Sequence, residues 1–472
     1  MANRLPVARS EQGAWKLSPG GLVNAMLPVV RGGGGVWIGW GGQIGGRGGE
    51  LTVDGLEMVD IPLSRREHKR YYCEMANEIL WPLFHDGVRN PHYSEDAWEA
   101  YKRINERFAR EADASTPRGG LVWIHDYHLL MVPGVLRRLR PDVRIGLFLH
   151  IPVPPVELFA TLPWRGPLVE SMIEADLIGT QTEPDAENLR RLLRQTVSDT
   201  SARGEGIIAD VAAFPISIDT PTYTREAMVG EEDGSVAECR SRFGADRTLY
   251  LGVDRLDYTK GIDQRLLAFE KALEMGDLDA REVCFMQIAV PSREAIPNYQ
   301  EISETVDGLV GRINGLFSSL GDAVVHYAKS SVPFPDLVRL YRAADVMVVT
   351  PLRDGMNLVA KEFVATRFDA TGELILSEFA GAAQELTQAT IVNPHDVPVL
   401  ADRLVAAHHN RDRSAPNDAM AVMHRHVTEH DVHRWARAFL DRLRHGPALP
   451  GMESEQTVAG TPTVRSQRVA PE

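Results

Sequence analysis

Two cationic side chains occupy a predicted turn between a strand and a helix. Residues 252–261 read GVDRLDYTKG, which places Arg255 and Lys260 in that turn. Two fixed cations beside a diphosphate would neutralise the negative charge that grows as the diphosphate leaves. The alternative is that both side chains form surface ion pairs with Asp254 and Asp257. The turn alone leaves the two interpretations open.

A second strand–turn–helix carries carboxylates. Residues 345–362 read as a buried strand, a polar turn and a helix that we expect to begin near Asn357. A helix N-terminus after a parallel strand presents free backbone N–H groups and a partial positive charge, which suit a phosphate. Asp354 and Glu362 would then stand at the carboxyl end of the sheet, where open α/β folds bind ligands. The alternative is an ordinary strand–turn–helix with surface carboxylates.

Histidine-bearing segments end two earlier strands. Residues 124–128 (IHDYH) and 148–154 (FLHIPVP) should bring His125, Asp126 and His150 to one sheet edge, facing a cleft. Neighbouring strand residues point to opposite faces, and no cysteine or further carboxylate completes a ligand set. We therefore expect no metal here.

Several weaker signals accompany these segments. Residues 18–22 (SPGGL) form a glycine turn that would let the backbone approach a ligand, although Pro-Gly turns are common. Tyr72 and Trp81 lie on an amphipathic helix, where aromatic residues more often belong to the core. Arg293 follows a strand and is expected to be an exposed cation. No G-x-G-x-x-G, P-loop or G-x-S-x-G motif supports a dehydrogenase, a nucleoside triphosphatase or a hydrolase.

Short apolar runs alternate with longer amphipathic segments, which is typical of parallel sheets covered by helices. The fold class is α/β. The first series of expected strands comprises residues 36–40, 121–125, 145–150, 176–180 and 212–216, and the second comprises 249–253, 283–289, 324–327, 346–350, 374–377 and 391–393. Between the series, residues 219–234 show no apolar periodicity and are expected to be an interdomain linker. We expect a mobile glycine loop over residues 32–49 and disorder over 446–472.

Composition narrows the function class. The 472 residues suffice for about three ordinary domains or for two large α/β units. The 65 acidic residues outnumber the 51 basic ones, which argues against nucleic acid as a partner. Three scattered cysteines suggest neither disulfides nor zinc and fit a reducing cytoplasm. No apolar stretch resembles a signal peptide or a membrane span, so no membrane partner is expected.

Taken together, these segments resemble the trehalose-phosphate synthases, retaining glucosyltransferases with two Rossmann-like domains facing a cleft (GT-B). The motifs that carry the resemblance are at residues 3–6, 18–21, 71–72, 80–82, 125–128, 148–152, 252–261, 291–293, 350–362, 393–394 and 430–435. The resemblance implies an N-terminal acceptor-binding domain over residues 1–220, a C-terminal nucleotide-sugar-binding domain over 221–428, and a helix over 429–445 that returns to the N-terminal domain.

The resemblance also implies the substrates and the residues that hold them. The acceptor, glucose 6-phosphate, would be held by Arg4, Tyr72, Trp81, Asp126 and Arg293. The donor, a nucleotide diphosphate glucose, would be held by Gly20, Gly21, His150, Arg255, Lys260, Asp354, Asn357, Leu358, Val359, Ala360, Lys361 and Glu362. No cofactor or metal is implied, because Arg255, Lys260 and the helix N-terminus take over the charge neutralisation that Mg²⁺ performs elsewhere.

The expected reaction forms α,α-trehalose 6-phosphate with retention at the anomeric carbon. We see no carboxylate that would serve as a double-displacement nucleophile, so a front-face mechanism is favoured. In it Asp354 and His150 would position the glucose, while Arg255 and Lys260 would stabilise the departing diphosphate. Closure of the domains would exclude water.

Two departures from the family pattern stand out. The family usually has an apolar strand before the Asn-Arg motif, whereas here Met1 precedes Asn3 by two residues. The first strand therefore appears missing, and we expect it to be encoded upstream. Several relatives carry an arginine near the donor where this chain has Phe334, which leaves the donor base open among uracil, guanine and adenine.

Two other functions remain as alternatives: a pseudo-glycosyltransferase that couples a cyclitol without a glycosidic bond, and a catalytically silent paralogue that senses sugar phosphates. The intact charged motifs disfavour both. The sequence does not decide the oligomeric state, a homo-oligomer included.

Overall fold

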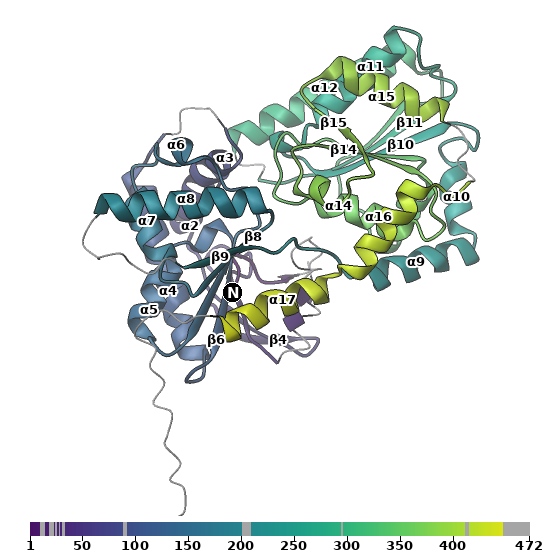
Figure 1. Ribbon diagram of the computed structural model, residues 1–472. Coiled ribbons are helices and arrows are strands. Elements are labelled where there is room, and N and C mark those ends of the chain that lie inside the picture. Colours follow the sequence, from purple (N-terminus) through teal and green to yellow (C-terminus); the bar gives the residue numbers. More distant parts are fainter. Residues whose placement is uncertain are drawn as a thin grey trace, which may run out of the picture.

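The computed structural model describes residues 1–9, 15–17, 23, 26–27, 29–30, 34–87, 92–200, 209–293, 296–410 and 415–446. Figure 1 shows two lobes, each built around a sheet flanked by helices. The α/β class expected from the sequence is confirmed. The expectations for residues 18–22 and for the tail from residue 447 lie outside the described residues.

The C-terminal lobe contains a six-stranded, wholly parallel sheet in the order β12-β11-β10-β13-β14-β15. Its strands are β10 (Thr248–Arg255), β11 (Val283–Val290), β12 (Val325–Ala328), β13 (Val346–Val349), β14 (Glu373–Ser377) and β15 (Thr390–Val392). Alternate residues face opposite sides, as the two-residue period of a strand requires. Leu249 and Leu251 join one hydrophobic cluster, whereas Tyr250 between them joins another.

Helices cover both faces of this sheet, which explains why its strands are apolar throughout (Figure 1). The helices and short turns of the lobe are α9 (Thr220–Glu232), α10 (Ser235–Ser241), η3 (Tyr258–Lys260), α11 (Ile262–Glu274), α12 (Pro297–Phe317), α13 (Phe334–Ala343), α14 (Leu358–Thr366), η4 (Gly381–Gln384), α15 (Val397–His409) and α16 (Asp418–Glu429). Helices α11, α12 and α15 pack on one face, and α9, α13, α14 and α16 pack on the other.

The N-terminal lobe contains a four-stranded parallel sheet, β6-β7-β8-β9, and a three-stranded mixed sheet, β3-β5-β4. The strands of the lobe are β1 (Val7–Arg9), β2 (Trp15–Leu17), β3 (Trp37–Gly39), β4 (Gly49–Val53), β5 (Leu56–Asp60), β6 (Leu121–His125), β7 (Arg144–Phe148), β8 (Leu177–Thr180) and β9 (Asp210–Ala213). The mobile glycine loop expected over residues 32–49 is wrong at residues 37–39, which form β3, and at Gly49, where β4 begins; both strands pair with β5.

Residues 1–5 lie between the two N-terminal sheets. The Met1 nitrogen donates to the Trp123 carbonyl at 2.8 Å, and the Met1 carbonyl accepts from the His125 amide at 2.9 Å. On the other side, Leu5 and the Asn3 carbonyl pair with Trp40. The position where we expected a missing first strand is thus occupied by these five residues.

The helices of the N-terminal lobe surround this sheet (Figure 1). They are α2 (Arg65–Glu67), η1 (His68–Leu80), α3 (Trp81–Phe84), α4 (Glu95–Ser115), η2 (Tyr127–Leu129), α5 (Val132–Leu139), α6 (Val156–Phe159), α7 (Arg165–Met172) and α8 (Glu183–Thr200). The segment that carries Tyr72 is a π-helix, and at its end the Trp81 amide donates to the Ala76 carbonyl, five residues back. Such helices are rare and often occur at functional sites.

The expected linker over residues 219–234 is wrong, because α9 occupies most of it. Its buried residues are Thr220, Tyr223, Ala227 and Gly230, which recur every three to four positions. This spacing is typical of a helix, but most of the buried residues are small, so the sequence shows no periodicity of large apolar residues.

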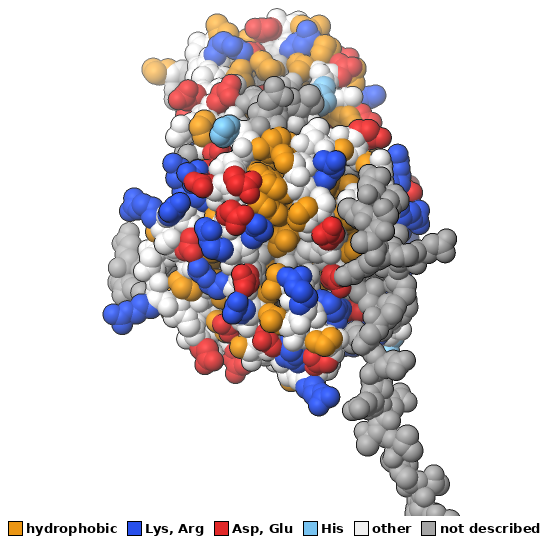
Figure 2. Space-filling view, turned by 90° about the vertical axis from the view of Figure 1, so that its left-hand side faces the viewer, with side chains coloured by type: hydrophobic (Ala, Val, Ile, Leu, Met, Phe, Trp, Pro, Cys, Tyr) orange, Lys and Arg blue, Asp and Glu red, His pale blue; other side chains and the backbone are white. Residues whose placement is uncertain are grey.

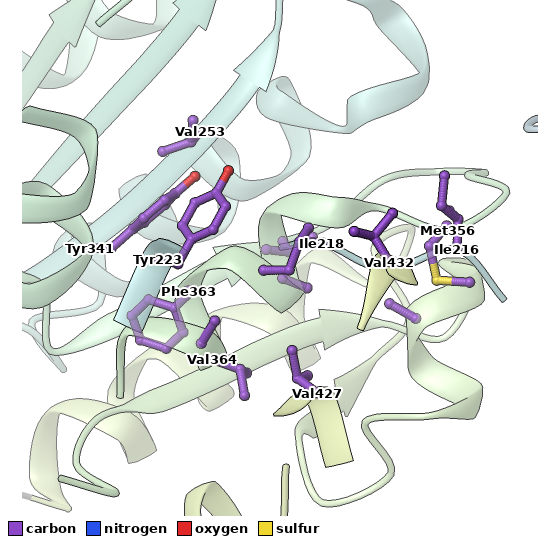
Figure 3. Close-up of a cluster of buried hydrophobic side chains, with 14 of the residues drawn as sticks. Ile216, Ile218, Tyr223, Val253, Tyr341, Met356, Phe363, Val364, Val427 and Val432 are labelled. Atoms are coloured by element: carbon purple, nitrogen blue, oxygen red, sulfur yellow. The ribbon is translucent and has the colours of Figure 1, made fainter. Parts of the chain in front are cut away.

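The chain crosses between the lobes twice, and the two crossings lie side by side. The Val432 amide donates to the Ile218 carbonyl at 3.0 Å, and the Thr220 hydroxyl donates to the Val427 carbonyl at 3.1 Å. Figure 3 shows Ile218, Val427 and Val432 together in one cluster of buried side chains. The lobes therefore share a continuous apolar junction.

After the second crossing, α17 (Val432–His445) lies along the N-terminal lobe (Figure 1). Its Phe439 ring stacks on Trp123 with centroids 4.6 Å apart. A Cβ added at Gly146 or Gly179 would lie 2.8 Å from the same Phe439 ring. These strand glycines therefore make room for the helix.

The surface seen in Figure 2 carries basic and acidic side chains interspersed around a hydrophobic patch. Within the described residues, no helix combines the length and the hydropathy needed to cross a bilayer.

Candidate active site

A cavity of about 390 Å³ lies between the lobes, at the carboxyl ends of both parallel sheets. Eleven of the residues singled out from the sequence line it: Trp81, Asp126, His150, Arg255, Lys260, Arg293, Asp354, Asn357, Leu358, Val359 and Glu362. The cavity therefore gathers residues from segments more than 280 positions apart in the chain.

The Lys260 ammonium pairs with Asp354 from the other charged segment, with Nζ and Oδ2 2.5 Å apart. Burial alone would raise the pKa of Asp354, but the attraction of Lys260 outweighs it and leaves this pKa below its ordinary value. The alternative of a Lys260–Asp254 surface pair is wrong, because Asp254 is bound to the buried Arg265 at 2.7 Å. Arg255 does lie 3.4 Å from Asp257, as that alternative held, but the Asp257 carboxylate is fully buried.

Arg265 fixes the shape of the Lys260 turn. Its fully buried guanidinium donates to the Lys260 carbonyl at 2.8 Å and to the Thr350 hydroxyl at 3.0 Å. The turn ends at Gly261, whose φ is +58° and whose added Cβ would lie 2.2 Å from the Thr350 carbonyl oxygen. Only glycine fits there, and its lack of a side chain allows the turn to pack against the end of β13.

Helix α14 begins at the cavity, as expected. Its N-cap is Asn357, at a φ of +76°, and the Asn357 Oδ1 accepts from the Ala360 amide at 3.3 Å. Glu362 accepts from the Tyr341 hydroxyl at 2.7 Å, and burial raises the pKa of Glu362. Lys361 points away from the cavity and pairs with Glu385 at 2.6 Å. Neither Ala360 nor Lys361 lines the cavity.

Arg293 is buried, so the expectation of an exposed cation is wrong: its side chain is 7% exposed. Its guanidinium lies 4.0 Å from the centre of the Trp81 ring and 3.2 Å from the Tyr127 hydroxyl, both in the other lobe. It also contacts Asp257, at 3.5 Å, and the Tyr299 hydroxyl. These partners from both lobes remove Arg293 from solvent.

His125, Asp126 and His150 lie together, as the strand ends indicated. The His125 Nδ1 and His150 Nε2 atoms are 3.0 Å apart, and the His150 amide donates to Asp126 at 3.2 Å. Burial lowers the pKa of His150 to about 3 and raises that of Asp126 to about 6. His150 is therefore a neutral imidazole at physiological pH.

Tyr72 and Arg4 stand beside the cavity rather than in its lining. The Tyr72 ring stacks on His128, a lining residue, with centroids 6.0 Å apart, and the Trp40 ring lies 6.2 Å from Tyr72 at a tilt. The Arg4 guanidinium lies 4.7 Å from the Trp40 ring. Gly20 and Gly21 lie outside the described residues.

Five polar residues that line the cavity were not singled out as site residues: His85, Tyr127, His128, Gln181 and Asp254. Asp257, which pairs with Arg255 and Arg293, was not singled out either. His85 stacks on Trp81 at 3.9 Å, and Gln181 follows β8 directly. The position of Gln181 after a parallel strand was the available signal. His85 had none, because it follows a short helix. In the described part of the chain, no group of three or more His, Cys, Asp or Glu side chains is arranged to hold a metal ion.

Backbone conformation marks the same region. Among the described non-glycine residues, six have positive φ, and Asp126, Arg293 and Asn357 all line the cavity. Such conformations cost free energy and cluster at functional sites.

Comparisons with known proteins agree with this geometry. The model of glycosyltransferase family 20 matches residues 1–445. The chain is 43% identical to the trehalose-6-phosphate synthase of Mycobacterium avium and 44% identical to that of Mycobacterium marinum, over 94% of this chain and 94% and 93% of those proteins.

Solved structures agree as well. The α,α-trehalose-phosphate synthase (UDP-forming) of Burkholderia xenovorans in complex with glucose-6-phosphate is 33% identical, with a TM-score of 0.83, over 90% of this chain and 97% of that one. The Escherichia coli protein bound with UDP-2-fluoro glucose is 32% identical, with a TM-score of 0.81, over 94% and 99%. The GT-B fold and the resemblance drawn from the sequence motifs are thus confirmed, and the chain belongs to glycosyltransferase family 20.

Proposed function

We propose that the protein catalyses, in this cavity, the transfer of glucose from UDP-glucose to glucose 6-phosphate, which forms α,α-trehalose 6-phosphate. The observation that carries this proposal is that one cavity holds two cationic sets: Arg255 and Lys260 at the end of β10, and Arg293 after β11. Arg255 and Arg293 both lie over the Trp81 ring and beside Asp257. Two phosphate-bearing substrates would need two such sets. The choice of uracil as donor base rests on the relatives described as UDP-forming or bound with a UDP sugar.

The donor diphosphate is assigned to Arg255, Lys260 and the first turn of α14. Leu358 and Val359 belong to that turn and line the cavity, where helix N–H groups attract an anion. In the free site Lys260 is held by Asp354, so the diphosphate would share this ammonium with the carboxylate. The backbone of Ala360 and Lys361, the Glu362 carboxylate and the turn at Gly20 and Gly21 complete the proposed donor site.

The acceptor is assigned to Trp81, Asp126 and Arg293, with Arg4 and Tyr72 beside them. The buried Arg293 guanidinium is a permanent cation in a region of low dielectric, which favours a phosphate dianion. Asp126 would accept hydrogen bonds from the acceptor hydroxyls. This division leaves Asp354 to bind the hydroxyls of the glucose that is transferred, with the His150 ring packed beside that sugar to position it.

A front-face mechanism fits the carboxylates that line the cavity. Asp354 is bound to Lys260, Asp254 to Arg265, Glu362 to Tyr341 and Asp126 to the His150 amide. Each is already engaged, so none is assigned as a nucleophile. The bond from the anomeric carbon to the diphosphate oxygen would break while the acceptor oxygen bonds on the same face. The acceptor's proton would pass to the departing oxygen.

The test is to mix the purified protein with glucose 6-phosphate and UDP-, GDP- or ADP-glucose, and to follow nucleotide diphosphate release and product stereochemistry by NMR. UDP release with an α,α product is expected, and EDTA should leave the rate unchanged because the charged groups are protein side chains. No release with any donor, despite binding of both substrates, would favour a silent sensing paralogue. Turnover only with a nucleotide diphosphate cyclitol as donor would favour a pseudo-glycosyltransferase.

Two further proposals concern organisation and location. The lobes correspond to domains that divide near residue 220, with residues 429–445 returning to the first, and α17 supports this division by packing on β7 and β8.

A cytoplasmic location is supported by Cys73, Cys239 and Cys284, none of which forms a disulfide bond.

A further inference from the structure

Gln181 directly follows β8 and is almost completely buried, with 1% of its surface exposed. Its Oε1 atom accepts a hydrogen bond from the Ile216 amide at 3.0 Å. A backbone N–H can only donate, so this contact settles which end of the Gln181 amide is the oxygen. The other end, Nε2, is therefore a donor with a fixed direction.

The Gln181 Nε2 atom lies 3.4 Å from the His150 Nδ1 atom. Because an amide nitrogen donates and does not accept, His150 Nδ1 must be the acceptor and carry no proton. In a neutral imidazole the proton then resides on Nε2, which lies 3.0 Å from His125 Nδ1. A continuous series of donors and acceptors thus runs from the Ile216 amide through Gln181 and His150 to His125.

We propose that Gln181 is a positioning residue that holds His150 as the neutral tautomer with its proton on Nε2. This inference rests on the proposed function for its chemical purpose. The glucosyl group becomes oxocarbenium-like during transfer and carries positive charge, so a second cation beside it would raise the barrier. By donating to Nδ1, Gln181 opposes protonation at that atom and keeps the ring uncharged next to the sugar.

Of the groups described around His150, Gln181 is the one whose hydrogen bond sets which ring nitrogen carries the proton. His125, the last residue of β6, is itself neutral because burial lowers its pKa. The carboxylate of the next residue, Asp126, accepts from the His150 amide rather than from the ring. The Met1 amine adjoins His125 and does not contact His150. From the other lobe, Gly355 approaches the His150 carbonyl, and the adjacent residue Asp354 is paired with Lys260. Burial lowers the pKa of His150 and so acts in the same direction as the Gln181 donor.

The decisive variant is Gln181→Glu, which keeps the shape and the acceptor for Ile216 but replaces the donor with a carboxylate. That carboxylate would accept a proton from His150 Nδ1 and so favour the charged ring. We expect a new acid limb in the pH profile of kcat: at least a tenfold loss near pH 6 that recovers as the pH rises. The matched control is Gln388→Glu, at an exposed position before β15, at the opposite end of the C-terminal sheet.

A direct readout needs no turnover. The ring nitrogens of ¹⁵N-labelled histidine report the tautomer, with His150 assigned by the signal lost in His150→Asn. The wild-type protein should show protonated Nε2, and Gln181→Glu should show protonated Nδ1. Protonated Nδ1 in the wild type, or a loss in Gln181→Glu that is equal at all pH values, would overturn the proposal. If the transferase assay fails while the wild type shows protonated Nε2, only the proposed function fails.

Discussion

The Lys260 ammonium lies 2.5 Å from the Asp354 carboxylate, although 94 positions separate the two residues. Both side chains are nearly buried, with 11% and 14% exposed. The pair joins the turn after β10 to the turn after β13, which are neighbouring strands. A leaving diphosphate would meet a cation whose position is already set, so no reorganisation is needed during transfer.

Lys260→Ala should therefore lower kcat more than it raises the donor KM. Loss of one preorganised charged donor costs about 2.7–4 kcal/mol, or roughly a hundredfold or more in kcat. Steady-state kinetics with UDP-glucose measure this. Arg281→Ala serves as the control, because Arg281 is 86% exposed and pairs with Asp279, two residues earlier on the surface. An unchanged kcat in Lys260→Ala would show that its pair with Asp354 is purely structural.

Arg293→Asn should raise the KM for glucose 6-phosphate by about 10- to 100-fold, since charge-assisted hydrogen bonds contribute about 1.5–3 kcal/mol. Asparagine is chosen because it tolerates the φ of +53° at this position. The donor KM should change little. Equal increases in both KM values would instead indicate that Arg293 supports the whole cleft through Trp81.

Asp126→Asn should change how stability depends on pH. Burial raises the pKa of Asp126 to about 6, so the folded protein binds a proton that the unfolded chain releases near pH 4. Stability due to this group is present at low pH and is lost as the pH rises through about 6, by roughly 3 kcal/mol. The asparagine variant lacks that loss. Urea unfolding from pH 4.5 to 7.5 measures the difference, with the exposed Asp96→Asn as control, and parallel curves for wild type and Asp126→Asn would contradict the prediction.

Gly355→Ala should hinder the approach of the two lobes. A Cβ at this position would lie 2.2 Å from the His150 carbonyl oxygen, across the cavity. Misplacing reacting groups by about 1 Å can lower a rate about a hundredfold, so kcat should fall while the melting temperature stays close to wild type. Gly308→Ala in α12 is the control, because its Cβ would meet nothing within 4 Å. Wild-type kcat in Gly355→Ala would show that this contact is not needed for turnover.

The apolar runs of the sequence predicted the central strands of the sheets better than the edge strands. The strand expected at residues 121–125 matches β6, whose apolar run is nearly all buried. The strand expected at 212–216 is shifted from β9, because β9 is an edge strand and its end is set by the first crossing between lobes. The β4–β5 hairpin was missed, although Asp54-Gly55, both at positive φ, is a common hairpin turn.

Within the site, sequence reasoning succeeded where the residues lie in one motif and failed where two lobes meet. Arg255 ends β10, and Lys260 and Asp354 follow β10 and β13, so their position at one sheet edge was predictable. The burial of Arg293 was not, because Trp81 and Tyr127, which cover it, belong to the other lobe. Periodicity within a strand or helix contains no information about such a partner.

The packing of Phe439 under β7 and β8 has a consequence for synthesis. On the ribosome, the first lobe emerges long before α17, so the space beside Gly146 and Gly179 stays open while the whole second lobe is made. The nascent chain must therefore carry an exposed apolar groove, lined by Trp123, Phe148 and Phe214, for more than 200 residues of elongation. Because transiently exposed apolar surface promotes aggregation, we expect the half-made protein to be aggregation-prone until α17 covers this groove.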